Sequence, residues 1–450
     1  MRRHVLCIMS VFFACIQLWT ACTLASALPS GQGSEDNAGY SSLWDELSEG
    51  FDYSLRFLTF GTYQAVADST QNPDNDFLQI PRYMADLDLR PDAILSFRRL
   101  DVSIKPRMNL RWSAWENGTR KGDEEWEDDW FINEWLARMR VARGLFVSYG
   151  RENLQWGPAF LYSPSNPFFL DNGRSNPKRE VPGMDFARIV WLPGMEWTIS
   201  FIGNTDKGRQ EFISGDFKEA YGFKLDYSGQ QGYAGLILSR NEVERDRFGA
   251  FGGCTATDAL LLYTDFAFSR GSDVLYPVED DTSPFGASMQ AVDEQSSSLK
   301  GALLVGGTYT FLAGPTLTVE YLYHGFGYND DQADYFYRLR RDASDAYGGP
   351  LWDLSRMTLG QTADPGLRFL RRNYGMLQYN HNDIKNLLNL TFRWTQNLDD
   401  GSGQFISIVD CLMGDHTQLF FIGTVNFGNG NTEFGTIVDS QWMIGLEYTF

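Results

Sequence analysis

The sequence predicts an all-β protein, a transmembrane antiparallel β-barrel of about 18 strands. Beyond the N-terminal segment, no stretch approaches the run of about 18 apolar residues that a spanning helix needs. Aromatic residues nevertheless make up 15% of the 450 residues, and 44 residues are glycine. Segments with an apolar side chain at every second position recur along the chain, as in strands with one face toward lipid.

The N-terminus has the features of a secretory signal peptide. A basic start, MRRH, is followed by the apolar run VLCIMSVFFACIQLW and then by small residues. Ala25–Ala27 fits a cleavage site of the A-x-A type. We therefore predict a signal peptide over 1–27, a polar periplasmic leader over 28–50 and an outer-membrane barrel over 51–450, with an uncleaved anchor as the alternative.

Each strand is predicted from alternation of apolar and polar side chains. In the stretch LDVSIKPRMNLRWSA, for example, Val102 and Ile104 share one face, and Asp101 and Ser103 share the other. The predicted strands are 55–63, 82–90, 100–114, 131–141, 145–155, 185–191, 195–203, 218–227, 232–240, 245–252, 258–268, 299–311, 316–325, 372–380, 387–396, 403–411, 416–427 and 441–450.

The last predicted strand, WMIGLEYTF, indicates closure of the barrel. Trp442, Ile444, Leu446, Tyr448 and Phe450 fall on one apolar face. A free sheet edge of this kind favours aggregation, so we expect the last strand to pair with the first and the apolar face to meet lipid. The terminal aromatic residue, Phe450, is also the expected contact for the barrel-assembly machinery.

The predicted connections alternate between short and long, which is typical of outer-membrane barrels with short periplasmic turns and long extracellular loops. The short turns are 142–144, 192–194, 228–231, 313–315 and 413–415, and the long loops are 115–130, 153–184, 204–217, 269–298 and 326–371. The segment 331–358 has helical spacing inside the last of these loops. The acidic run 116–129 is predicted to be a solvated external loop, with calcium binding, or a divalent-cation bridge to lipopolysaccharide, as alternatives.

Charge and chemistry exclude several functions. The chain carries 38 Lys and Arg against 58 Asp and Glu, a net charge of -20, which argues against a nucleic-acid partner. The expected partners are instead outer-membrane lipids, lipopolysaccharide, and an anionic or sugar solute. Cys254 and Cys411 lie beyond the signal peptide, and we expect two isolated thiols rather than a disulfide.

No enzyme signature is present. The motifs H-E-x-x-H and G-x-S-x-G are both absent, and we expect no cofactor, no metal site and no enzymatic activity. Glu320 and His324 share a strand face, and a catalytic pair there is the minor alternative to ordinary polar wall residues.

Basic residues concentrate on the polar faces of the first predicted strands, against the acidic balance of the whole chain. Arginine binds carboxylate and phosphate in a two-pronged fork, so such a wall favours anions. The alternative is that these charges simply pair with neighbouring acids. We predict a pore lining formed by Lys105, Arg107, Arg111, Glu134, Arg138, Arg140, Arg151 and Tyr162.

The stretch YGRENLQWGPAFLYSPSNPFFLDNG (149–173) carries a family resemblance. Its prolines prevent pairing as a strand, so the segment can fold into the barrel and constrict it. The residues that carry the resemblance are Gly150, Arg151, Trp156, Gly157, Pro164, Asn166 and Pro167. Between Trp130 and about Phe201 the sequence resembles uncharacterised proteobacterial porins and alginate-export-like barrels, and capsule-anchoring barrels share part of the motif.

The resemblance implies a barrel of about this strand number that moves or holds a polar solute. We therefore expect a porin- or exporter-like channel in the Gram-negative outer membrane after signal-peptide cleavage. It would pass small polar or anionic solutes, or polysaccharide, through an arginine-lined lumen. The alternative is a barrel that anchors surface polysaccharide without conducting.

Overall fold

The computed structural model describes residues 45–211, 217–243, 245–291 and 299–450. The predicted signal peptide and most of the predicted leader lie outside the described residues. The described residues up to Glu49 belong to one compact unit, and Gly50–Phe450 form a second unit that holds all the strands.

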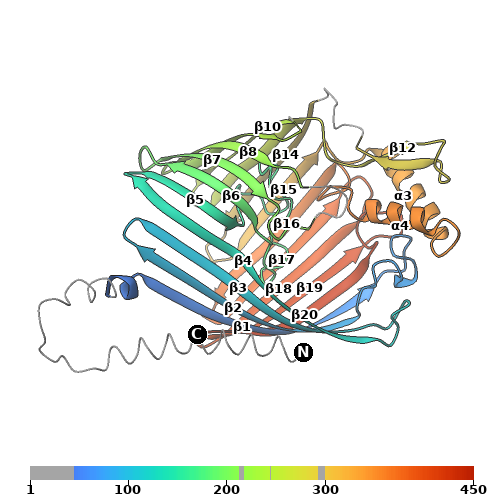
Figure 1. Cartoon of the computed structure of the whole chain (residues 1–450), viewed down its shortest axis with the longest axis horizontal. Helices are drawn as coiled ribbons and strands as arrows, with labels where there is room; N and C mark the ends of the chain where they lie inside the picture. Colours follow the sequence, from blue (N-terminus) through green and yellow to red (C-terminus); the bar gives the residue numbers. More distant parts are fainter. Residues whose placement is uncertain (1–44, 212–216, 244, 292–298) are drawn as a thin grey trace, which may run out of the picture. The chain divides into compact units, whose positions relative to one another are not determined.

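The second unit is an 18-stranded antiparallel sheet that closes on itself (Figure 1). β1 pairs with β20, with Phe57 opposite Tyr448 and Tyr63 opposite Trp442. The predicted fold class and the predicted closure are therefore confirmed. The strands are β1 Phe51–Val66, β2 Tyr83–Phe97, β3 Leu100–Ala114, β4 Glu124–Ala142, β5 Leu145–Glu152, β6 Met184–Trp191, β7 Trp197–Asp206, β8 Ala220–Ser228, β9 Gly232–Asn241, β10 Asp246–Thr257, β11 Leu260–Arg270, β14 Leu299–Thr310, β15 Thr316–His324, β16 Asn373–Ile384, β17 Leu388–Asn397, β18 Gly403–Met413, β19 Thr417–Phe427 and β20 Val438–Thr449.

Several predicted strands end too early, as in β2 and β10, and the acidic run is where a predicted strand begins too late. The run is expected from its composition to be an external loop, but β4 begins at Glu124 and pairs with β3. Glu124 lies opposite Ala114, and Asp129 lies opposite Asn109. Trp126 and Trp130 interrupt the acids, and tryptophan favours strands, which explains why pairing continues through the charges.

The exposed fraction of the side chains alternates along β20, which shows which face of the strand lies on the outside of the barrel and which faces the lumen. Trp442 is 39% exposed and Ile444 is 67% exposed, whereas Met443 between them is 9% exposed. Side chains at successive positions of a strand point to opposite faces. The apolar residues at even positions of β20 therefore cover the outside of the barrel.

The long connections lie at one end of the barrel and the short ones at the other. At the long-loop end, β12 (Tyr276–Glu279), β13 (Ala287–Gln290), α3 (Asp330–Asp345) and α4 (Trp352–Ala363) lie together beyond the strands (Figure 1). The predicted helical segment is thus two helices. α3 begins at a capping box in which the Asn329 side chain accepts from the Gln332 amide and the Gln332 side chain accepts from the Asn329 amide.

A buried arginine joins these helices to two other loops. Arg340 on α3 is 2% exposed and donates to Thr70, Gln71 and the Gly430 carbonyl. Thr70 and Gln71 precede the short 3₁₀ helix η2 (Pro73–Asn75) in the connection between β1 and β2. The loops at this end therefore form one connected layer.

Three further observations concern disulfide bonds, metal sites and membrane-spanning helices. Cys254 and Cys411 are both free thiols. Within the described ranges, no group of three or more His, Cys, Asp or Glu side chains could hold a metal ion. Among the described residues, no helix is both long enough and apolar enough to cross a membrane.

Candidate functional site

The connection between β5 and β6, residues 153–183, crosses the interior of the barrel, and we call it the inward loop. Its residues contact side chains on β3, β11, β15, β17 and β20, which lie around the whole circumference. A segment that touches all of these walls must pass through the lumen. Its position follows from buried carboxylates that bind its backbone.

Glu320 on β15 is the first anchor of the inward loop. This residue is 1% exposed, and its carboxylate accepts hydrogen bonds from the Phe160 amide at 2.7 Å and the Leu161 amide at 2.9 Å. The Tyr263 hydroxyl donates to the same carboxylate at 2.7 Å. Hydrogen bonds to a charged acceptor are stronger than neutral ones, so this carboxylate holds two successive residues of the loop to the wall.

Asp265 on β11 is the second anchor. It is 0% exposed and accepts from the Ser163 hydroxyl and from the Ser165 amide, both at 2.7 Å. Gly157 makes the close approach possible, because its φ is +83° and a Cβ there would lie 2.4 Å from Asp265 Oδ2. The Trp-Gly pair of the sequence motif therefore shapes the loop around this carboxylate.

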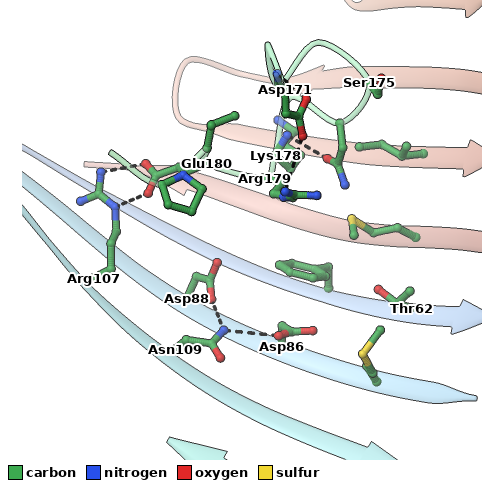
Figure 2. A pocket seen from close by; sticks show the side chains of 18 of the residues that line it. Thr62, Asp86, Asp88, Arg107, Asn109, Asp171, Ser175, Lys178, Arg179 and Glu180 are labelled. Atoms are coloured by element: carbon green, nitrogen blue, oxygen red, sulfur yellow. Dashed lines mark hydrogen bonds and ion pairs between the residues drawn. The ribbon is translucent and has the colours of Figure 1, made fainter. Parts of the chain in front are cut away.

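Arg107 on β3 is the third anchor, and Figure 2 shows its guanidinium bound to the carboxylate of Glu180 in the inward loop. Nε and Nη2 bind the two oxygens of Glu180 at 2.6 and 2.8 Å, and Nη2 also meets Asp92 at 2.8 Å. Nη1 donates to the carbonyls of Pro91 and Pro106 at 2.9 and 2.7 Å. Each of the three guanidinium nitrogens thus has at least one protein partner.

The electrostatics of this anchor stabilise ionised Glu180. Burial alone would raise the pKa of the Glu180 carboxyl, but the hydrogen bond and charge of Arg107, with the charges of Arg90 and Arg56, hold that pKa below its usual value. Three strands along the same part of the wall, Lys178 binds Glu447 of β20 at 2.7 Å. The returning arm of the inward loop is therefore held to this part of the wall by ion pairs at two points.

Apolar packing fills the space between the first arm of the inward loop and the strands β11 to β16. Leu161 and Tyr162 are 5% and 3% exposed. They belong to one buried cluster with Ala159, Tyr263, Leu304, Leu322, Phe369, Tyr374 and Met376. Side chains close this part of the lumen. A cavity is found in another part of it.

The cavity has a volume of about 610 Å³ and lies between the inward loop and the strands β1 to β4 and β18 to β20. We call it the lumen cavity. Figure 2 shows loop residues such as Asp171, Lys178 and Arg179 on one side of it, and Asp86 and Asp88 on the strands opposite. The charged side chains that line it are Asp86, Asp88, Arg90, Arg107, Arg111, Asp129, Asp171, Lys178, Arg179, Glu180, Arg209 and Arg368.

Most of these charges are paired, and the two most exposed arginines among them, Arg111 and Arg179, keep unused donors. Arg111 binds Asp86 through Nε at 2.7 Å, and its side chain is 42% exposed. Arg179 approaches Asp171 at 3.5 Å through one nitrogen, and its side chain is 64% exposed. Within the described part of the chain, the other guanidinium N–H groups of these two residues have no protein acceptor, so they can bind a solute.

The comparisons with known proteins agree with this fold. No family model matches the sequence, and no curated protein matches it. The structure is similar to that of OccAB1 from Acinetobacter baumannii, with 14% identity, a TM-score of 0.54, and coverage of 89% of this chain and 97% of that one. It is also similar to OccK7 (OpdD) from Pseudomonas aeruginosa, with 10% identity, a TM-score of 0.52 and coverage of 89% and 98%.

A third similar structure is the outer membrane protein OprD from Pseudomonas aeruginosa, with 9% identity, a TM-score of 0.52, and coverage of 88% of this chain and 94% of that one. At these identities the likeness establishes a shared barrel fold. These three structures are Occ and OprD proteins, not alginate-export-like barrels, so the resemblance to that family remains a prediction from the sequence motif.

The structure brings two of the eight predicted lining residues to the lumen cavity, Arg107 and Arg111. Tyr162 lies in the buried apolar cluster, edge-on to His324. The other five do not line the cavity. Lys105 pairs with Glu134 at 3.0 Å, Arg138 pairs with Asp101, Arg140 donates to the Arg98 carbonyl near a short turn, and Arg151 pairs with Asp185.

Residues of the inward loop that line the cavity were not identified from the sequence. Lys178, Arg179 and Glu180 follow one another in the stretch NPKRE, and no periodic pattern assigns a side to them. Their concentration of charge inside an otherwise proline- and glycine-rich loop was the available signal. Asn166 of the sequence motif has a structural role, because it is 1% exposed and its Oδ1 accepts from the Phe168 amide.

Proposed function

We propose that this chain is an outer-membrane channel for small polar solutes, with a preference for anions. The observation that carries the proposal is the lumen cavity, an opening beside a constricting loop inside a closed barrel. Arg111 and Arg179 present unused guanidinium donors to it. Such donors bind carboxylate, phosphate or sugar hydroxyl groups.

The outer surface of the barrel supports placement in a membrane. Large apolar side chains on the strands are exposed, among them Phe201 at 54%, Val319 at 53% and Ile444 at 67%. A soluble monomer rarely exposes contiguous apolar surface of this extent, whereas a barrel in lipid requires it. Outer-membrane lipids and lipopolysaccharide would contact this surface, and Phe450, at 65% exposed, is available to the assembly machinery.

The anion preference follows from which charges remain available. Arg107, Glu180 and Lys178 are occupied with one another or with the wall, so they set the position of the inward loop. Arg111 and Arg179 are the more exposed cations, and a low-dielectric wall focuses their field on the solute path.

The test is the reversal potential of the purified mature protein in a planar bilayer under a KCl gradient. The wild type should be anion-selective, and the double variant Arg111→Gln/Arg179→Gln should shift toward cations. Arg138→Gln is the matched control, because Arg138 is exposed and does not line the lumen cavity. An unchanged reversal potential in the double variant would contradict the role of the two arginines.

A barrel that anchors surface polysaccharide without conducting is the alternative outcome of the same recording. In that case correctly folded protein would carry no current. Deleting part of the 325–372 connection would then remove polysaccharide from the cell surface.

A further inference from the structure

The lumen cavity has one charged side and one apolar side. The charged side comes from β2, β3 and the inward loop. The apolar side includes Ile406 on β18, Ile422 on β19 and Met443 on β20. Phe60 on β1 and Met84 on β2 continue the apolar lining.

The apolar side chains form one continuous surface across neighbouring strands. Ile422 lies opposite Met443 on β20 and opposite Ile408 on β18. Ile406, Ile408, Phe420, Ile422 and Met443 make a single buried cluster, against which Phe60 packs. The surface is therefore built by adjacent strands, and it is not a set of isolated apolar residues.

The surface is sharply bounded along the strands. Nearer the long-loop end, the next inward-facing side chains on β18 and β19 are polar. Gln404 lies two residues before Ile406, and Thr424 lies two residues after Ile422. In the other direction, Lys178 of the inward loop lies over the Phe420 ring, 4.9 Å from its centre. The apolar patch that faces the cavity thus lies between the polar side chains of Gln404 and Thr424 and the inward loop.

Inward faces of transmembrane barrels that conduct polar solutes are usually polar. The outer surface of this barrel already supplies its contact with lipid, so an apolar inward patch is not needed there. A solute with a hydrocarbon part would gain from lying against the patch, because the solute's own apolar surface is then removed from water.

We infer that the lumen cavity binds an amphipathic anion, with its hydrocarbon or aromatic part against Ile406, Ile422 and Met443 and its charged group toward Arg111 and Arg179. This inference rests on the proposed channel function and narrows its solute class. On this view, the apolar side of the lumen cavity distinguishes between solutes that carry the same charge.

The test compares hexanoate with gluconate, two six-carbon monoanions that differ in the polarity of the chain. Each is added to a single channel conducting KCl, and the concentration that halves the current is measured. Full burial of one methylene group corresponds to about a fourfold change in affinity. Partial burial of the hexanoate chain should therefore lower its half-blocking concentration about tenfold relative to gluconate.

Substitutions locate the effect. Ile422→Thr, which replaces part of the apolar side chain by a hydroxyl, should reduce the preference for hexanoate at least threefold. Ile408→Thr is the matched control, because Ile408 belongs to the same cluster but does not line the cavity. Thr424→Val, which enlarges the apolar surface, should strengthen the block by hexanoate and serves if Ile422→Thr does not fold.

Equal block of the wild type by hexanoate and gluconate would overturn the inference while leaving the channel function intact. Equal effects of Ile422→Thr and Ile408→Thr would overturn the assignment to this surface. Absence of any KCl current from folded protein would overturn the proposed function itself, and this inference with it.

Discussion

Glu320→Gln should loosen the inward loop while preserving the shape of the side chain. The glutamine amide nitrogen must face at least one of the amide donors of Phe160 and Leu161, which now bind carboxylate oxygens at 2.7 and 2.9 Å. A buried donor without an acceptor costs about 1–3 kcal/mol, and each remaining bond weakens by about 1 kcal/mol when its acceptor becomes neutral. Relief of the desolvation of a buried carboxylate offsets part of this, which leaves a net loss of about 3 kcal/mol.

A loss of about 3 kcal/mol corresponds to about a hundredfold larger detached population of this part of the loop. Hydrogen exchange at the amides of Phe160 and Leu161, followed by mass spectrometry, should accelerate by about that factor. Single-channel traces should show brief excursions to higher conductance. Glu134→Gln is the control, because Glu134 pairs with Lys105 on the neighbouring strand of the wall. Exchange as slow in Glu320→Gln as in the control would refute the anchoring role.

Three further perturbations probe other parts of the molecule. Gly157→Ala should destabilise the barrel by about 2 kcal/mol in thermal unfolding, because its φ is +83° and the new Cβ would meet Asp265; an unchanged midpoint would contradict this. Arg107→Lys should destabilise by about 2–3 kcal/mol, because lysine cannot replace the fork to Glu180. It should leave the reversal potential unchanged, and a shift in selectivity would show that Arg107 meets the solute. Finally, burial raises the pKa of Glu433, in the β19–β20 loop, to about 7. The protonated form is then favoured in the fold, so the free energy of unfolding should fall by about 3 kcal/mol as pH rises from about 4.5 to 7, and Glu433→Gln should remove this dependence.

The geometry around Glu433 explains why its titration should affect the loop layer. Its carboxylate accepts from the Leu370 amide at 3.0 Å, from Asn397 at 2.9 Å and from the Tyr374 hydroxyl. It therefore joins the connections at 325–372 and 428–437 to β16 and β17. Asp400 lies nearby and raises the pKa further by repulsion between like charges. Thermal unfolding at about pH 5 and pH 8 is the measurement, and equal midpoints in the wild type would contradict the expectation.

Most of the barrel could be predicted from sequence because a strand in a two-sided wall imposes a period of 2. β3 was predicted at 100–114 and spans Leu100–Ala114. The inward direction of Arg107 and Arg111 follows from the same alternation. In β18, by contrast, GQFISIVDCLM places apolar residues on both faces, so alternation alone could not identify Ile406 as a residue of the lumen.

The candidate site was less predictable because it depends on pairs that are distant in the sequence. Glu180 meets Arg107 across 73 positions, and Lys178 meets Glu447 across 269. The inward loop has no repeating backbone geometry, so a sequence pattern cannot assign a direction to its side chains. This is why Tyr162, expected at the pore, lies in the buried cluster that fixes the loop.

The most direct test of the proposed channel is single-channel recording of the refolded mature protein in a planar bilayer under a KCl gradient. We predict a steady conductance with a reversal potential on the anion-selective side, because the lumen cavity lies beside the inward loop and presents Arg111 and Arg179. No current from protein that is demonstrably folded as a barrel would contradict this prediction.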